Sequence, residues 1–383
     1  MTLKKKCRAC RNSFVGKSLL QLAGMPPAVQ NLPVDKGKAV ASSVVLDVRQ
    51  CSFCGLVQLS NDPVPYYKDV IRAGSISPSM KARQRDAFKA FINRFSLKGK
   101  NILEIGSGRG EYLSILGELD VRAFGMENNP GFNKIAKDAG LKLFAGYPTD
   151  LPKPPDAIAF DAFISINFLE HAPDPGDFLR SSARLLCKNG VGMLSVPDFE
   201  SELRDNGLFS FISDHLSYFS SDSLRHVLSA NGFEVIDVFR NEKLNVVTAY
   251  CKKRGGCDLS APRRQSQESL GAINSYVDGR LKQGGRIALW GASHLAFSII
   301  AASKIGDKIA YIVDSAPFKQ GRFSPASGLK IHPPRHLAED PVDTVIILCP
   351  EYSAEIAGGI KKKYPRIVRH IATFADGRLK IIQ

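Results

Sequence analysis

The stretch FISDHLSYFS, residues 211–220, places an acid, a histidine and a tyrosine close together in an otherwise apolar and hydroxylic segment. Asp214, His215 and Tyr218 could form an acid–base set. A histidine can take up a proton near neutral pH, and a phenol can donate a hydrogen bond to a developing oxyanion. The alternative is an ordinary loop with a buried imidazole. One line of sequence leaves both open, because a base is defined by its geometry toward a substrate.

Four cysteines form two closely spaced pairs near the N-terminus. Cys7 and Cys10 lie in CRAC, and Cys51 and Cys54 lie in CSFC. Each C-x2-C pair can bind one ion from a tight turn, and four thiolates complete a tetrahedral zinc site without an open coordination position. The pattern therefore predicts a structural zinc. The 40 residues between the two pairs should carry structure of their own.

The segment NILEIGSGRGEYLSIL is typical of a strand, a glycine turn and the start of a helix. Gly106, Gly108 and Gly110 allow a sharp backbone turn and the close approach of a ligand. The run reads E-x-G-x-G-x-G, which differs from the G-x-G-x-x-G of dinucleotide-binding sites. Glu104 precedes the turn, and Glu127 ends the next predicted strand. These acids favour a ligand other than a dinucleotide.

Short apolar strands alternate with amphipathic helices through the middle of the chain, as in NILEIG, RAFGMEN, FDAFISIN, GVGMLSVP and FEVIDVFR. This alternation indicates a parallel α/β sheet. After a linker rich in Arg, Gln, Ser and Gly, the rhythm restarts with RIALWGA, IAYIVDS and TVIILCP. We therefore predict a Rossmann-like α/β core in residues 63–255. A small zinc-binding domain (1–62) should precede it, and a smaller α/β domain (256–383) should follow it.

Composition and charge limit the class of protein. Apolar content of 44% and charged content of 23% are ordinary for a globular protein. No run approaches the roughly 18 apolar residues of a membrane helix, and no apolar h-region follows the basic N-terminus, so we expect a cytoplasmic protein. The net charge is +15. Residues 1–100 hold 18 Lys+Arg and 5 Asp+Glu, whereas residues 101–250 hold 13 and 21. Basic flanks would attract a nucleotide diphosphate as well as RNA.

The glycine turn with its two acids resembles the class I S-adenosylmethionine-dependent methyltransferases. Two further blocks agree in order and spacing: FDAFISINFLEHAPDPGDFL resembles that family's fourth strand and the loop after it, and LLCKNGVGMLSVPD resembles the next helix-to-strand turn, interrupted by Gly190 and Gly192. The resemblance implies that the three turn glycines line the cofactor and that Glu127 holds both ribose hydroxyls. It places further residues at the cofactor site: Glu104, Asn128, Asn167 and His171.

Taken over nearly its whole length, the chain resembles the zinc-containing sugar C-methyltransferases of deoxysugar biosynthesis. The specific marks are CRAC…CSFCGLVQL, DHLSYFSSDSLRHVLSANGFEVIDV and IVDSAPFKQGRFSPASGLKIHPPRHL. In that family the substrate is a nucleotide-linked keto-sugar. A histidine of an E-H-x-x-Y-F block removes a proton next to the ketone, and the resulting enolate attacks the cofactor's methyl group. His215 and Tyr218 fall on that block, and Asp214 replaces its glutamate.

Three positions depart from that family's pattern. Ile212 stands where the family has a tyrosine, and Arg83 ends the stretch YYKDVIRAGSISPSMKAR where the family has a histidine. The turn WGASHLAF of the last domain has one glycine and no lysine; its alternatives are a packing turn and a substrate contact through His294. All three lie where the substrate is expected. A hydroxyl substrate would need the base and less of the oxyanion donor, so His215 and Tyr218 could also serve O-methylation.

Two other functions are compatible with parts of the sequence. The predicted four-cysteine zinc site and the basic first hundred residues are compatible with an RNA methyltransferase. However, the chain has no basic strand face interleaved with aromatic residues for base stacking and no motif for a flipped base. A non-catalytic binding module would not need the glycine turn together with Glu127, His215 and Tyr218. We therefore expect an enzyme that acts on a small molecule, in particular a nucleotide sugar, rather than on nucleic acid or a membrane.

Overall fold

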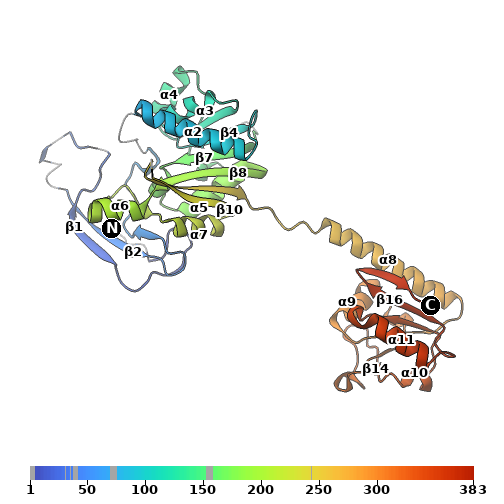
Figure 1. Cartoon of the computed structure of the whole chain (residues 1–383). Helices are drawn as coiled ribbons and strands as arrows, with labels where there is room; N and C mark the ends of the chain where they lie inside the picture. The colour runs from blue at the N-terminus through green and yellow to red at the C-terminus, as the bar shows by residue number, and fades with distance from the viewer. Residues whose placement is uncertain are drawn as a thin grey trace. The chain divides into compact units, whose positions relative to one another are not determined.

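The computed structural model describes residues 5–383 apart from residues 31, 35, 38–41, 70–75, 152–157 and 243. Residues 70–75 belong to the tyrosine- and serine-rich stretch noted above, so that part of the stretch lies outside the described residues. The chain forms two compact units, Met1–Gly256 and Cys257–Gln383, and each unit has a central sheet of its own (Figure 1).

Seven strands form the central sheet of the first unit, in the order β10-β11-β8-β7-β4-β5-β6. They are β4 (Asn101–Ile105), β5 (Arg122–Glu127), β6 (Leu143–Ala145), β7 (Phe160–Ile166), β8 (Leu186–Pro197), β10 (Phe233–Asn241) and β11 (Val246–Lys253). β11 runs antiparallel to β8 and β10, and the other neighbouring pairs are parallel. The predicted α/β, Rossmann-like fold class is confirmed, whereas β11 was not predicted.

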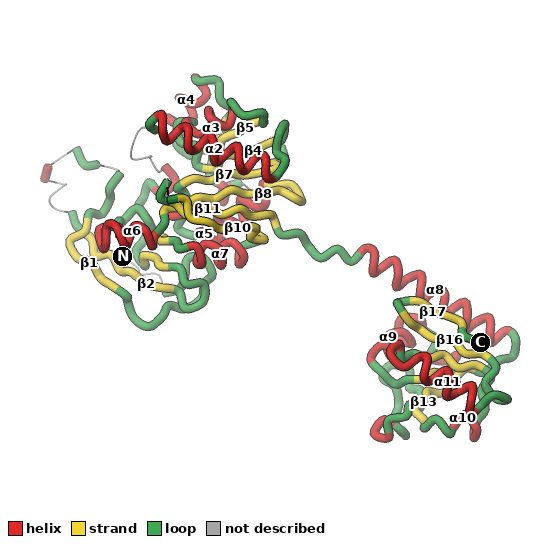
Figure 2. Tube along the Cα trace, viewed as in Figure 1, coloured by secondary structure: helices red, strands yellow, loops and turns green. Residues whose placement is uncertain are grey.

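Helices cover both faces of this sheet (Figure 2). The α-helices are α2 (Pro78–Arg94), α3 (Glu111–Gly117), α4 (Pro130–Asp138), α5 (Pro175–Leu185), α6 (Phe199–Asn206) and α7 (Ser221–Ala230). Leu103 of β4 packs in the same core as Phe178 of α5, while its neighbour Ile102 packs in a second core with Phe88 of α2. Successive side chains of a strand point to opposite faces, so an apolar strand such as β4 fills both cores.

A second, four-stranded sheet in the first unit joins the N-terminal region to the FISDHLSYFS stretch. Its order is β1-β2-β3-β9. The strands are β1 (Leu20–Met25), β2 (Val44–Gln50), β3 (Val57–Leu59) and β9 (Ser217–Tyr218). β9 pairs antiparallel with β3, with Tyr218 opposite Val57. The cysteine-containing region and the candidate catalytic stretch therefore share one sheet.

One expected feature of the core differs from the prediction. Gly190 and Gly192 were expected to interrupt the chain at a turn. Both lie inside β8, but its pairing with β7 shifts register between Leu186 and Val191, so the strand is irregular at Gly190 and only Gly192 lies in the regular ladder. A Cβ atom added to Gly192 would lie 2.2 Å from the ring of Phe163 on the neighbouring β7. This glycine therefore serves close packing of a side chain against the strand rather than a change in chain direction.

The second unit contains a six-stranded sheet in the order β14-β13-β12-β15-β16-β17. Its strands are β12 (Ile287–Trp290), β13 (Tyr311–Val313), β14 (Ile331–His332), β15 (Thr344–Ile347), β16 (His370–Ala375) and β17 (Arg378–Ile381). Only β17 runs antiparallel to its neighbour. The α-helices are α8 (Ser260–Lys282), α9 (His294–Ser303), α10 (His336–Glu339) and α11 (Ser353–Lys363).

Short 3-10 helices lie in the loops of both units. They are η1 (Tyr67–Asp69), η2 (Pro148–Asp150), η4 (Leu169–His171), η5 (Gly207–Ser210), η6 (Gly306–Lys308), η7 (Pro317–Lys319) and η8 (Pro350–Tyr352). Among the residues with a described structure, no helix has both the length and the apolarity needed to cross a bilayer. α8 is long enough, with 23 residues, but charged residues recur along it.

Candidate active site and four-cysteine cluster

The glycine turn between β4 and α3 is built so that side chains are excluded. Gly106 has φ 76°, and a Cβ atom there would lie 2.5 Å from the ring of Phe168. Gly110 caps the N-terminus of α3 with φ 87°, and a Cβ atom there would lie 2.4 Å from Leu141. Both positions combine a left-handed backbone with close neighbours, so they require glycine.

Glu127 ends β5 and holds the turn through its carboxylate. Oε2 accepts a hydrogen bond from the Gly108 amide at 2.9 Å, and Oε1 accepts one from the Asn129 amide at 2.8 Å. The side chain of Asn133 donates to the Glu127 carbonyl at 2.9 Å. Glu127 is only 3% exposed. The predicted acid and the predicted glycine turn are therefore in direct contact.

The other predicted cofactor residues lie at the carboxyl ends of neighbouring parallel strands. Glu104 is buried in β4 immediately before the turn, and Asn128 directly follows β5. Asn167 directly follows β7, adopts φ 47°, has an exposed side chain and donates its amide hydrogen to the Ser195 carbonyl at 2.8 Å. In open α/β sheets ligands bind at this end of the strands, so the fold brings these residues to a suitable edge.

His171 and His215 lie next to each other beyond the same sheet edge. Their ring centroids are 4.7 Å apart and the rings are nearly perpendicular, at 80°. His171 ends η4, and its Nδ1 is 2.8 Å from the carbonyl oxygen of Asp214. Glu170 completes the cluster, with Oε1 3.8 Å from His171 Nε2. Sequence reasoning placed His171 beside the cofactor, but not against His215.

Burial sets the protonation of this cluster. It lowers the pKa of His171 to about 4, and burial together with His171 lowers the pKa of His215 to about 3. Burial raises the pKa of Glu170 to about 8. At neutral pH both imidazoles are therefore uncharged. His215 has a free lone pair, but its pKa lies below the value near 7 that was expected of a base, because charged imidazole is poorly solvated there.

Asp214 does not hold His215. Its carboxylate accepts hydrogen bonds from the Tyr66 hydroxyl at 2.7 Å and from the Val29 amide at 2.9 Å. Its carbonyl oxygen instead orients His171. Within the described part of the chain, the His215 ring makes no hydrogen bond. Asp214 thus acts on the histidine pair through its main chain, while its carboxylate secures the N-terminal region.

Tyr218 is buried beside His215, with ring centroids 6.3 Å apart. Its hydroxyl accepts a hydrogen bond from the Ile212 amide at 2.9 Å and donates one to the Ile212 carbonyl at 3.2 Å. The hydroxyl thus already donates one hydrogen bond and accepts another, both with the backbone of Ile212. To donate to a substrate oxygen, Tyr218 must release the Ile212 carbonyl.

Val29 contacts the candidate site although no sequence pattern pointed to it. It lies in the Pro/Gly-rich stretch between the two cysteine pairs, and its amide binds Asp214. Ser213 also donates a hydrogen bond from its hydroxyl to the carbonyl of Pro26. The only signal in the sequence was the expectation that the long segment between the cysteine pairs carries structure. A backbone amide has no residue-type signature, so this contact was not predictable.

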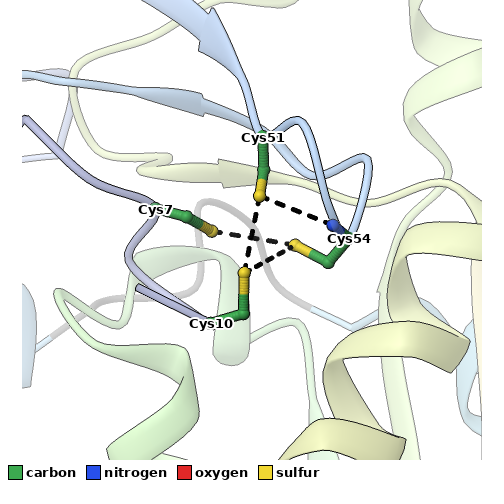
Figure 3. Close-up of side chains that lie close together, drawn as sticks. All are labelled: Cys7, Cys10, Cys51 and Cys54. Atoms are coloured by element: carbon green, nitrogen blue, oxygen red, sulfur yellow. Dashed lines mark hydrogen bonds between the residues drawn. The ribbon is translucent and has the colours of Figure 1, made fainter. Parts of the chain in front are cut away.

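The four cysteines converge on one point (Figure 3). The Sγ atoms of Cys7 and Cys54 are 3.7 Å apart, those of Cys10 and Cys51 are 3.4 Å apart, and those of Cys10 and Cys54 are 3.6 Å apart. A zinc–sulfur bond of about 2.3 Å in a tetrahedral shell places the sulfurs about 3.8 Å apart. The four thiols therefore match the size of a zinc site in which every position is taken by sulfur.

Arg8 lies between the first two cysteines and is 1% exposed. Its guanidinium donates hydrogen bonds to the carbonyl oxygens of Leu59 at 3.0 Å and Pro173 at 3.1 Å, and also to that of Asn61. Burial lowers the pKa of Arg8 to about 10. The cation thus links the cysteine region both to β3 and to the loop that follows His171.

The second unit repeats the arrangement of acid and turn. Asp314 follows β13, and its carboxylate accepts hydrogen bonds from the amides of Ala292 and Ala316, each at 2.8 Å. Lys319 lies 3.0 Å from the same carboxylate. The turn is WGASHLAF, in which Gly291 has φ 111° and His294 begins α9 with an exposed side chain. The Asp314 carboxylate therefore holds this turn by a backbone amide, as the Glu127 carboxylate holds the glycine turn of the first unit.

Comparisons with known proteins agree with this architecture. Residues 80–238 match a family model described as a methyltransferase domain, and residues 264–372 match one described as a C-methyltransferase C-terminal domain. The chain is an enzyme of the S-adenosylmethionine-dependent methyltransferase class. The core matches a general methyltransferase model, and the second unit matches the model of a C-methyltransferase domain.

Of two individual relatives, one matches nearly the whole chain and the other matches about a quarter of it. The C-methyltransferase NovU of Streptomyces niveus is 23% identical over 394 residues, covering 93% of this chain and 92% of that protein. A ubiquinone biosynthesis O-methyltransferase of Xanthomonas oryzae is 30% identical over 108 residues, covering 27% of this chain and 45% of that protein. The similarity to NovU thus extends through both units.

Proposed function

We propose that this enzyme transfers a methyl group from S-adenosylmethionine to a sugar that carries a nucleotide. The acceptor is either the carbon next to a ketone or a hydroxyl oxygen. The observation that carries this proposal is the convergence, in one compact unit, of a glycine turn held by Glu127 and a pair of uncharged histidines, His171 and His215. The similarity to NovU over 93% of the chain supports a C-methyltransferase, and the resemblance to sugar C-methyltransferases supports a sugar.

The cofactor belongs at the edge where β4, β5 and β7 end. Glu127 is the proposed partner of the ribose hydroxyls, because its carboxylate lies at the turn that the cofactor must follow. Gly106, Gly108 and Gly110 keep that turn free of side chains. The proposed lining is completed by Glu104, Asn128, Asn167 and His171. When bound, S-adenosylmethionine supplies an electrophilic methyl group.

His215 is the proposed general base. Its imidazole is uncharged, and its ring makes no hydrogen bond within the described residues, so a lone pair is available to take up a proton from the substrate. Asp214 contributes by fixing His171 through its carbonyl oxygen. Tyr218 is the proposed donor to the developing oxyanion once its hydroxyl exchanges the Ile212 carbonyl for the substrate.

The second unit is the proposed substrate-binding domain. The contact between Asp314 and Ala292 reproduces the acid-and-turn arrangement of a nucleotide site, and Lys319 brings a positive charge next to it. A cation at this position suits the diphosphate of a nucleotide sugar. The proposed division is 1–62 for zinc, 63–255 for the cofactor and 256–383 for the substrate.

Zinc in the four-cysteine cluster is proposed as structural. All four donors are cysteines with the spacing and size of a closed tetrahedral site, so no position is left for a substrate. Reduced cysteines also suit the cytoplasmic location that we propose.

Methyl transfer to a panel of acceptors tests the function. Purified protein is incubated with S-adenosylmethionine carrying a labelled methyl group and, separately, with nucleotide keto-sugars, nucleotide sugars without a ketone, and RNA. We expect label in a nucleotide sugar and a steep loss of that transfer in His215→Ala. Transfer to RNA alone would contradict the proposal.

A further inference from the structure

We propose that Glu170, His171 and His215 form a binding site for a divalent first-row transition metal, separate from the four-cysteine cluster. One carboxylate oxygen and one nitrogen from each ring all lie within 4.8 Å of one another. Two imidazoles and one carboxylate are a donor set that proteins use for ions such as Fe²⁺ and Zn²⁺. The chemistry differs from the four-thiolate cluster, so the two sites should select ions independently.

His171 is already oriented as a ligand. Its Nδ1 lies 2.8 Å from the carbonyl oxygen of Asp214, and a carbonyl oxygen can only accept. Nδ1 therefore carries the hydrogen, and the lone pair is on Nε2. Metal-binding histidines usually fix their second nitrogen on a carbonyl or carboxylate in this way. The free Nε2 faces Glu170, with Oε1 at 3.8 Å.

Glu170 supplies a carboxylate that lacks a partner. The residue is 2% exposed, and its Oε2 has no hydrogen-bond partner among the described residues. A buried carboxylate oxygen left unpaired is costly, because it has given up its contacts with water. A cation held between Glu170 and the histidine pair would take the place of the Glu170 proton and satisfy that oxygen.

His215 completes the site from a different segment of the chain. Its ring stands at 80° to that of His171 with centroids 4.7 Å apart, so one ring is directed edge-on toward the other. The His215 imidazole makes no hydrogen bond within the described residues, which leaves it free to coordinate. The three ligands thus come from η4 and from the loop before β9, two segments that Asp214 ties together.

Metal binding and base catalysis compete for the same lone pair. This step rests on the proposed function, in which His215 accepts the substrate proton. A ring nitrogen that coordinates an ion has no lone pair left for a proton. An ion in this site therefore inhibits methyl transfer reversibly, and removal of the ion restores it.

Cobalt titration tests the site without relying on activity. Co²⁺ is added to the purified full chain that retains zinc in its cysteines, and visible absorption is recorded. We expect one Co²⁺ per chain with weak nitrogen/oxygen-type bands. Glu170→Gln keeps the shape of the side chain and should weaken Co²⁺ binding at least tenfold. Glu202→Gln, which removes a nearby carboxylate outside the cluster, should bind Co²⁺ as the wild type does.

A second variant distinguishes the loss of a metal ligand from misfolding. His171→Asn retains an amide donor for the Asp214 carbonyl but lacks Nε2, and it should also lose Co²⁺ binding. Undiminished affinity in both variants, or cobalt found only with thiolate charge-transfer bands, would overturn the site. Turnover that stays constant while Co²⁺ saturates the site would overturn the competition and the base role of His215. The titration decides the metal site even if no acceptor sugar is methylated.

Discussion

Tyr218 is paired with Val57 across β9 and β3, so the strand that follows the four-cysteine cluster supports the candidate catalytic stretch. Leu59 donates its amide hydrogen to the Leu216 carbonyl at 3.0 Å, and Leu216 donates its own to the Glu170 carbonyl at 2.8 Å. A continuous set of backbone contacts thus leads from Cys54 to the His171 and His215 pair.

Loss of the zinc that we propose for the four-cysteine cluster should therefore loosen the candidate active site. In Cys51→Ser we expect the metal content to fall from about one zinc per chain and the amides of Ser217 and Tyr218 to exchange faster with deuterated water, because β3 loses its anchor. Metal analysis and hydrogen exchange followed by mass spectrometry measure both. The matched control is Cys257→Ser, at an exposed cysteine of the second unit. Unchanged protection of 217–218 would show that β9 does not depend on the cluster.

Glu127→Ala should abolish binding of S-adenosylmethionine. The substitution removes the carboxylate that we assign to the ribose hydroxyls and also frees the Gly108 amide that it holds. Isothermal titration calorimetry measures the affinity directly. Glu234→Ala, at an exposed position of β10, serves as the control and should bind the cofactor normally. An unaltered affinity in Glu127→Ala would remove this residue from the cofactor site.

His215→Ala should lower turnover by about 10²-fold or more while S-adenosylmethionine still binds, because a general base contributes at least that factor. His226→Ala is the control: His226 is an exposed histidine on α7 whose Nδ1 lies 2.8 Å from the Asp222 carbonyl oxygen. Turnover is measured with the nucleotide sugar that the acceptor panel identifies. If His215→Ala turned over at the wild-type rate, another group would have to be the base.

Glu202 should make stability fall as the pH rises. Burial raises its pKa from 4.5 to about 7, with Asp198 adding to the effect. The folded state then binds a proton more tightly than the unfolded state, so the contribution is complete below 4.5 and is lost as pH rises through 7. Glu202→Gln should lose less stability than the wild type between these pH values, measured by urea unfolding. Parallel loss in both proteins would contradict the assignment.

The fold was largely predictable because its signals are local. Alternation of apolar strands with helices predicted β4, β5, β7 and β10 near their observed bounds. β11 was missed, because its segment VVTAYCKK is joined to β10 by a short hairpin connection and no helix separates the two strands. Gly192 was misread as a turn residue, since the crowding by Phe163 that requires it comes from a neighbouring strand.

The candidate site was predictable in its parts but not in its contacts. Cys7, Gly108 and Glu127 belong to short motifs whose spacing already specifies a chemistry. The partner of Asp214 was not accessible in the same way. Its place beside His215 in the sequence suggested an acid–base set, yet the backbone turns the Asp214 carboxylate toward Tyr66.

The sequence by itself determined the class of enzyme, the glycine turn and the cysteine set, because each depends on residue type and spacing within one short segment. Only the tertiary structure decided that Asp214 binds Val29 and Tyr66, that Glu170 lies against the two histidines, and that Tyr218 extends the N-terminal sheet. These contacts join segments far apart along the chain. They are fixed by burial of shared surfaces and by pairing of backbone groups, which leave no periodic trace in the sequence.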